Sequence, residues 1–264
     1  MAEDLKKMYR TIVEDHFPNQ MEISFVDDAG RQTLYYEKVL WAIDGVAKGL
    51  RYGENPGQEA ALYKLVNGNL VLGETETIAP GQYLASDIEL LQSGKHPGKT
   101  NLTDADNALN ILRYFQDRPT AVIVKHNNPC GVACADALAD AYHKAYMADR
   151  VAAFGGCIAL NRAVDKATAE AVSDQYAEVV VAPEFEKGSL EILARRKNLR
   201  VIRIGNIGRL QQFVGQRCVE FKSLIDGGVI AQWSFVPASR AAQDLSLAET
   251  EYQGKTFRIE REPT

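Results

Sequence analysis

Hydrophobic and polar residues follow two different patterns along this chain of 264 residues. In the first hundred residues, apolar positions at helical spacing predict an amphipathic helix over 4–16. Alternating apolar and polar positions then predict antiparallel strands joined by turns, and the second turn lies at Asn67-Gly68-Asn69. The strands are expected over residues 21–26, 33–40, 61–66 and 70–72. This part of the chain is therefore predicted to form a helix followed by two hairpins.

Short apolar runs alternate with longer amphipathic segments from residue 101 onward. The runs are too short for helices and are rich in Val and Ile, which predicts strands over 120–124, 179–182 and 200–204. The amphipathic segments predict helices over 103–115, 136–147, 166–175 and 190–196. Thr103 or Asn101 is expected to cap the first of these helices.

The alternation of strands and helices predicts both the fold class and the place of a ligand. Helices between successive strands imply right-handed crossovers and a mostly parallel sheet, and therefore an α/β fold. In such sheets ligands bind beyond the carboxyl ends of the strands. The loops after Val124, after Phe154 and before Val179 are therefore the expected places for a functional site.

Composition and charge exclude several classes of protein. With 46% hydrophobic and 25% charged residues, the chain has the composition of an ordinary soluble globular protein. The net charge of −5 argues against general nucleic-acid binding, which needs a basic face. No apolar run is long enough to span a membrane, and the charged N-terminus lacks the core of a signal peptide. The four cysteines fit reduced thiols, so a cytoplasmic location is expected.

The segment from Val124 to Gly131 is the first candidate for chemistry. A predicted buried strand ends in Lys125-His126, and a Pro-Cys-Gly turn is expected to follow. A neutral imidazole can accept a proton near pH 7, and a neighbouring ammonium can stabilise an oxyanion or protonate a leaving nitrogen. Because the strand period breaks at a strand end, both side chains can line one pocket. The alternative is a solvated Lys and a His that bonds a backbone carbonyl.

Two further segments have a composition suited to ligand contacts. The stretch 50–58 is dense in turn-forming residues, and its Arg51 and Tyr52 can bind a phosphate through a bidentate contact and a hydroxyl donor. Alone, it is equally typical of a structural loop. In 153–160, the pair Gly155-Gly156 interrupts an apolar run and predicts close approach of the backbone to a ligand or to another part of the chain.

Metal and hydrolase chemistry are not expected. Pro129-Cys130 with Cys134 resembles half of the zinc motif of nucleobase deaminases, but three residues separate the cysteines instead of two. No His-x-Glu or Cys-x-Glu precedes them in the chain. The sequence also lacks a Gly-x-Ser-x-Gly nucleophile motif, a phosphate-binding Walker motif and a dinucleotide glycine motif.

Taken together, six segments resemble one enzyme family. They occur in the order and rough spacing of the AICAR transformylase domain of the bifunctional purine-biosynthesis enzymes, which also carry an IMP cyclohydrolase domain. The matching segments are residues 50–56, 101–104, 125–131, 153–156, 178–183 and 226–229. The resemblance implies a cytidine-deaminase-like three-layer α/β unit with a mixed, mostly parallel sheet, preceded here by an N-terminal helix and hairpin.

The resemblance also implies a reaction and the residues that carry it. The family transfers a formyl group from 10-formyltetrahydrofolate to the 5-amino group of AICAR, giving FAICAR, without a metal. At the matching positions, His126 is implied as the general base, Lys125 as the group that stabilises the transition state, and Arg51 as the phosphate ligand. The other implied nucleotide contacts are Tyr52, Asn101, Gly155 and Glu178.

The extent of the resemblance sets the expected domains and partners. Residues 1–45 are expected to be a lead-in, and 46–264 the first of the two α/β units of the transformylase, without the cyclohydrolase domain. A composite site is therefore expected, completed by a second copy in a homodimer or by a separately encoded second half, unless the chain is a fragment of a longer product. The alternative is a subunit that binds AICAR or a related purine nucleotide without turning it over.

Overall fold

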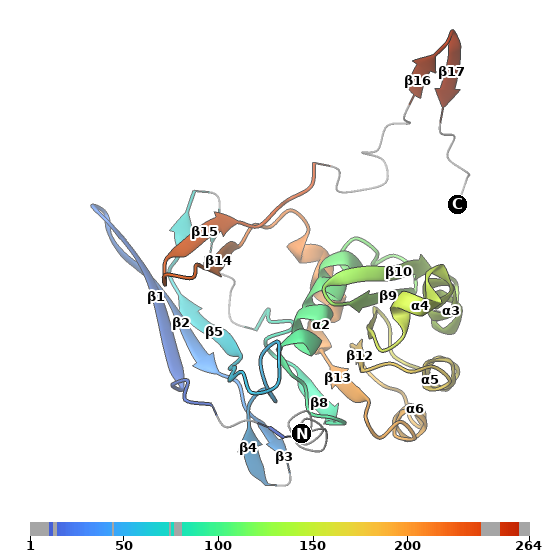
Figure 1. Cartoon of the computed structure of the whole chain (residues 1–264), viewed down its shortest axis with the longest axis horizontal. Helices are drawn as coiled ribbons and strands as arrows, with labels where there is room; N and C mark the ends of the chain where they lie inside the picture. The colour runs from blue at the N-terminus through green and yellow to red at the C-terminus, as the bar shows by residue number, and fades with distance from the viewer. Residues whose placement is uncertain are drawn as a thin grey trace. The chain divides into compact units, whose positions relative to one another are not determined.

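The computed structural model shows two compact units, Met1–Phe213 and Val214–Thr264 (Figure 1). The structure describes residues 11–12, 15–43, 45–73, 75–76, 81–238 and 249–258. The expected boundary between a lead-in and the rest of the chain, after residue 45, falls inside the first unit and stays a prediction.

A six-stranded mixed sheet forms the centre of the first unit, in the order β10-β9-β11-β12-β13-β8. Its strands are β8 (Glu89–Gln92), β9 (Thr120–Lys125), β10 (Asn128–Cys134), β11 (Cys157–Leu160), β12 (Val179–Ala182) and β13 (Arg200–Arg203). Strands β11, β12 and β13 are parallel neighbours, whereas β9 runs antiparallel to both β10 and β11, and β8 runs antiparallel to β13. Four of the six strands thus point the same way, which confirms an α/β fold with a mixed, mostly parallel sheet.

Helices cover both faces of this sheet and make three layers (Figure 1). On one face lie α2 (Lys99–Leu112) and the 3-10 helix η1 (Gly205–Phe213); on the other lie α3 (Leu138–Ala148), α5 (Lys166–Ser173) and α6 (Ser189–Leu193). A short helix, α4 (Arg150–Ala153), precedes β11. Because both faces are covered, strands such as β12 are buried along their whole length and read as continuous apolar runs.

The helices and strands predicted from residue 101 onward are confirmed, although their ends differ from the predicted ones by up to a few residues. Helix α2 begins at Lys99, four residues before the predicted start, and Gly98 is its N-cap. Asn101 takes part in the cap, but as the third residue of the helix, where its Oδ1 accepts from the Gly98 amide at 3.1 Å. Thr103 lies inside the helix and bonds back to the Thr100 carbonyl at 3.2 Å, so it is not a cap.

The first unit also contains a three-stranded antiparallel sheet in the order β1-β2-β5. The hairpin of β1 (Gln20–Asp27) and β2 (Gly30–Lys38) confirms the first predicted pair of strands. The second predicted hairpin is wrong, because β5 (Tyr63–Gly68) pairs with β2 and not with the strand that follows Asn69. That strand, β6 (Val71–Leu72), pairs instead with β7 (Thr75–Glu76). A further hairpin joins β3 (Trp41–Ile43) and β4 (Val46–Lys48).

The turn after β9 differs from the prediction. His126 and Asn127 form a two-residue connection to β10, and both have positive φ, 52° and 65°. This is the geometry of a primed turn, which matches the twist of a hairpin. Pro129 and Gly131 therefore belong to an edge strand and not to a turn, with an irregularity in register between them that leaves Cys130 unpaired.

The second unit contains two hairpins. Strand β14 (Val219–Ser223) pairs with β15 (Val229–Trp233), and β16 (Glu249–Tyr252) pairs with β17 (Lys255–Arg258). The first of these hairpins closes at Leu224, whose amide donates to the Gly228 carbonyl at 2.7 Å.

Most of the predicted N-terminal helix over 4–16 lies outside the described residues. Asp15 and His16, which are described, are not helical. Among the described residues, no helix combines the length and the apolar character that a membrane crossing requires.

Candidate functional site

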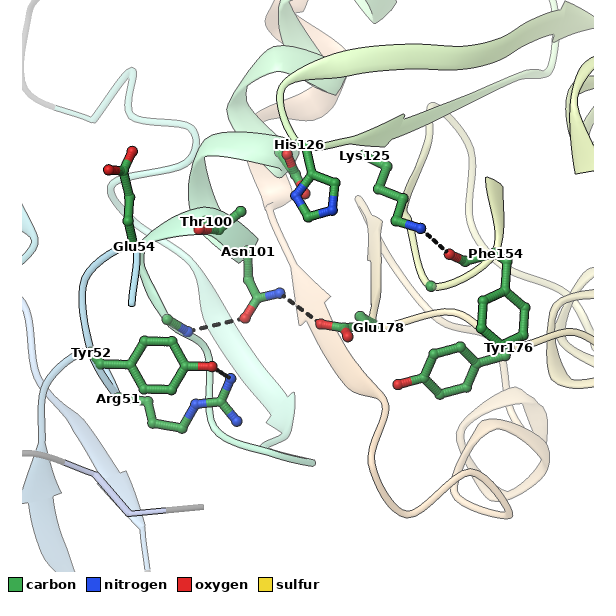
Figure 2. Close-up of a pocket in the computed structure, with 13 residues that line it drawn as sticks. Arg51, Tyr52, Glu54, Thr100, Asn101, Lys125, His126, Phe154, Tyr176 and Glu178 are labelled. Carbon is green, nitrogen blue, oxygen red and sulfur yellow. Dashed lines mark hydrogen bonds between the residues drawn. The ribbon is translucent and has the colours of Figure 1, made fainter. Parts of the chain in front are cut away.

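A pocket of about 360 Å³ opens at one edge of the central sheet (Figure 2). Its walls come from the loop after β4, the first turns of α2, the β9–β10 turn and the loops that precede β11 and β12. The structure brings together all seven residues expected at a site: Arg51, Tyr52, Asn101, Lys125, His126, Gly155 and Glu178.

The pocket lies at the amino ends of the parallel strands, which corrects the expectation of a site beyond their carboxyl ends. Val124, near the end of β9, pairs with Cys157, the first residue of β11. Because β9 is antiparallel to β11, its carboxyl end and the amino ends of β11 and β12 share one edge. Of these three strands, only β9 has its carboxyl end at the pocket. The site therefore lies at this edge of the sheet because β9 runs opposite to β11 and β12.

Arg51 and Tyr52 are held against the start of α2. The Arg51 amide donates to the Pro97 carbonyl and the Lys99 amide donates to the Tyr52 carbonyl, both at 2.9 Å. The Arg51 guanidinium lies 4.4 Å from the centre of the Tyr52 ring, and its Nη2 donates to the Tyr52 hydroxyl at 2.8 Å. Arg51 is only 5% exposed. Burial lowers the pKa of Arg51, which stays far above neutrality, so a cation is fixed in the wall of the pocket.

His96 fixes the same segment from behind. Its Nε2 donates to the Gly49 carbonyl at 2.6 Å, and its Nδ1 accepts from the Ser93 hydroxyl at 3.1 Å. The ring also meets Trp41 edge-on. Burial lowers the pKa of His96, and the positive charge of Arg51 acts in the same direction. A neutral His96 therefore anchors the loop that carries Arg51.

Glu178 links the start of α2 to a second buried arginine. Its Oε2 accepts from Asn101 Nδ2 at 3.3 Å (Figure 2), and it also accepts from Arg200 Nη1 at 3.1 Å. Arg200 is 1% exposed and also donates from Nε to the Lys95 carbonyl at 2.6 Å. Burial lowers the pKa of Arg200, whereas the Glu178 carboxylate opposes that shift. The charge of Arg51 acts on the same carboxylate, so Glu178 interacts with two buried guanidinium groups, with Arg200 through a hydrogen bond and with Arg51 through its charge.

Lys125 and His126 occupy the opposite side of the pocket (Figure 2). Lys125 is the last residue of β9, and its Nζ donates to the Phe154 carbonyl at 2.8 Å. His126 follows in the turn, so both side chains face one cavity although they are neighbours in sequence. This arrangement places an imidazole and an ammonium together, the two groups required for proton transfer and oxyanion stabilisation.

Gly155 makes room for an aromatic pair at the rim. It has φ +76°, and a Cβ there would lie 3.1 Å from Tyr176 Cε1. Phe154 and Tyr176 pack with ring centres 4.9 Å apart. Burial raises the pKa of the Tyr176 hydroxyl, and the Glu178 carboxylate raises it further. The glycine is thus required by its backbone conformation and by the ring beside it.

Several residues at the site were missed by sequence reasoning. Glu54, Thr100, Asp104, Phe154 and Tyr176 also line the pocket, and Arg200 lies behind it. Asp104 is the last residue of the matched segment 101–104 and is followed two residues later by a second aspartate. The sequence therefore contained an indication that this position belongs to the site. Nothing in the local sequence distinguishes Arg200, because its role depends on a partner 22 residues away.

Among the described residues, no group of three or more His, Cys, Asp or Glu side chains is placed to hold a metal ion. All four cysteines are free thiols, with Cys157 buried and Cys218 exposed.

The fold and the pocket describe an α/β protein in which one pocket brings a buried arginine together with a Lys-His pair. Comparison with known proteins identifies the family. The family model described as the AICARFT/IMPCHase bienzyme matches residues 7–255. The chain therefore belongs to the AICARFT/IMPCHase bienzyme family.

Curated relatives carry the name bifunctional purine biosynthesis protein PurH. The chain is 36% identical to that of Caldicellulosiruptor saccharolyticus over 215 residues, which is 81% of this chain and 36% of the relative. It is 39% identical to that of Acetivibrio thermocellus over 202 residues, 76% of this chain and 33% of the relative. For Synechococcus elongatus the identity is 46% over 159 residues, 60% of this chain and 28% of the relative. The chain thus spans about a third of the length of these relatives.

Proposed function

We propose that this chain takes part in transfer of the formyl group of 10-formyltetrahydrofolate to the 5-amino group of AICAR in purine biosynthesis. The observation that carries the proposal is the meeting of Lys125-His126 with Arg51 in one pocket of a member of this family. The relatives' printed name refers to purine biosynthesis. A cytidine-deaminase-like arrangement of the central sheet and a cytoplasmic location belong to the same proposal.

The proposed chemistry assigns one role to each side of the pocket. His126 takes a proton from the amine as its nitrogen attacks the formyl carbon, and Lys125 stabilises the resulting oxyanion. The bond from the formyl carbon to the folate nitrogen then breaks, and Lys125 helps to protonate that nitrogen. Arg51 binds the phosphate of the nucleotide. Tyr52, Asn101, Gly155 and Glu178 provide the further nucleotide contacts.

The size of the pocket supports a composite site. A volume of about 360 Å³ lies near the lower limit of small-molecule sites, roughly 300–1,000 Å³. The proposed transfer needs two substrates bound side by side, a nucleotide and a folate, for which a pocket near this lower limit is small. We therefore propose that a second copy of this chain, or a separate second transformylase half, supplies the remaining part of the folate site.

Formyl transfer and AICAR binding, measured together, test the proposal. The substitution His126→Ala is expected to reduce transfer by about 10²–10⁴-fold, the usual contribution of a general base. AICAR affinity by titration calorimetry should change little. His143→Ala, which alters an exposed histidine of α3, is the matched control and should leave both unchanged.

Three outcomes would contradict the proposal. Unchanged transfer by His126→Ala would overturn the assigned base. Tight AICAR binding with no transfer, alone or with any candidate partner, would favour the non-catalytic binding subunit. A chain that does not bind AICAR would contradict both functions.

A further inference from the structure

The turn that carries His126 is conformationally demanding. His126 and Asn127 have φ values of 52° and 65°, in the left-handed region that non-glycine residues seldom adopt. Primed hairpin turns normally place Asn or Asp followed by Gly at these two positions, and this turn has neither a first-position Asn nor a second-position Gly. Contacts from outside the turn are therefore needed to hold it.

Helix α2 supplies those contacts at two points. Oδ1 of Asp104 accepts from the Asn127 amide at 2.7 Å, and the neighbouring His126 amide lowers the pKa of the same carboxyl group. One turn further along α2, Asn107 Nδ2 donates to Asn127 Oδ1 at 3.1 Å. Residues three apart lie on one face of a helix, so both side chains reach the same turn. Helix α2 thus bonds Asn127 through both its backbone amide and its side chain.

The position of Asp104 in α2 has no explanation within the helix. It is the sixth residue, beyond the first turn where a carboxylate interacts favourably with the helix dipole. It is 6% exposed, and burial raises the pKa of its carboxyl group, which the two amide donors oppose. A buried carboxylate is costly unless it is hydrogen-bonded, and the amides of the turn provide that compensation.

We propose that Asp104 is a positioning residue, whose carboxylate holds the His126–Asn127 turn in its left-handed conformation and so fixes the imidazole of His126 over the pocket. The inference rests on the proposed function of His126 as the general base. Catalysis depends steeply on such placement, because a shift of about 1 Å can reduce a rate by about 10²-fold.

The first test measures the turn itself and does not depend on turnover. In a crystal structure of the full-length Asp104→Ala variant, we expect the φ values of His126 and Asn127 to leave the left-handed region. In solution, the Asn127 amide proton resonance should move upfield relative to the wild type, since a bond to a carboxylate shifts it downfield. Asp104→Asn, which keeps the side-chain shape and one acceptor oxygen, is the variant to use if Asp104→Ala does not fold. Because an amide oxygen is uncharged, the Asn127 amide proton should move upfield in it by less than in Asp104→Ala.

The second test separates positioning from binding. Asp104→Ala should lower kcat by about 10–100-fold, with KM for AICAR within about twofold of the wild type, since the loss is in placement of the base. Adding Asn127→Gly should restore part of kcat, because glycine adopts the left-handed conformation without the Cβ penalty. Asp140→Ala, an exposed acidic residue of α3, is the control and should leave kcat unchanged.

The two proposals fail in different ways. Wild-type φ values and amide shifts in both Asp104 variants would overturn the positioning role, whatever the activity. If Asp104→Ala moves the turn but His126→Ala leaves formyl transfer intact, the assigned base is wrong and the structural role of Asp104 stands. A rise in KM with an unchanged kcat would also overturn the positioning role, because it would make Asp104 a nucleotide contact.

Discussion

Arg200 offers the clearest test of how the buried polar groups hold the site together. In Arg200→Met, the apolar stem of the side chain is retained and the guanidinium is removed. The three hydrogen bonds lost are those to the Lys95 carbonyl at 2.6 Å, the Glu178 carbonyl at 3.2 Å and Glu178 Oε2 at 3.1 Å. The three losses differ in their effect on stability, because the acceptors differ in whether another donor or water can replace Arg200.

Two of the three losses are compensated. The Glu178 carbonyl also accepts from the backbone amide of Arg200 at 3.0 Å, and that bond survives the substitution. The Glu178 side chain is 38% exposed, so water can replace Arg200 at its carboxylate. The Lys95 carbonyl loses its charged donor, and one hydrogen bond to a charged group contributes about 1.5–3 kcal/mol. We therefore expect the free energy of unfolding to fall by about 2 kcal/mol.

Urea unfolding measures this change. The midpoint should decrease with an unchanged m value, and Tm should fall by about 4–8 °C, since each kcal/mol shifts a unit of this size by roughly 2–4 °C. Arg195→Met is the matched control, because the Arg195–Glu170 pair is exposed and should contribute less than about 1 kcal/mol. If Arg200→Met loses no more stability than Arg195→Met, the buried hydrogen bond of Arg200 to the Lys95 carbonyl does not stabilise the fold as proposed.

Three further perturbations have clear expected outcomes. A Cβ at Gly131 would lie 1.9 Å from the Ala145 carbonyl oxygen, so Gly131→Ala should cost more than about 3 kcal/mol in urea unfolding, whereas Gly205→Ala, with open space, should cost less than about 1. Gly155→Ala forces a left-handed alanine and should cost roughly 1–3 kcal/mol, with weaker AICAR binding in calorimetry. Burial lowers the pKa of His96, so as pH falls below about 6.5 the histidine is protonated in the unfolded chain before it is protonated in the folded one. The free energy of unfolding should therefore decrease from about pH 6.5 down to the pKa of the folded state. His96→Gln should reduce this pH dependence in urea unfolding measured from about pH 8 to 5.

Elements with a strong local pattern can be predicted from the sequence alone. Strand β12 begins and ends at the predicted residues, and β9 and β13 differ from prediction by one residue, because strands covered on both faces are continuous apolar runs. The motifs also predicted which residues to look for at the site, since they carry chemistry that a short segment displays. Lys125 and His126 are the plainest case, because a strand end brings neighbours to one pocket.

The pairing and the direction of the strands become visible only in the folded molecule. Periodicity gives the buried faces of a strand but not its partner, so β5 was predicted to pair with β6 and in fact pairs with β2. The direction of β9 relative to β11 is likewise non-local, and it moves the pocket to the amino ends of the parallel strands. Asp104 and Arg200 gain their roles from groups more than 20 residues away. Their hydrogen bonds form only when the folded sheet and helices bring those groups within reach.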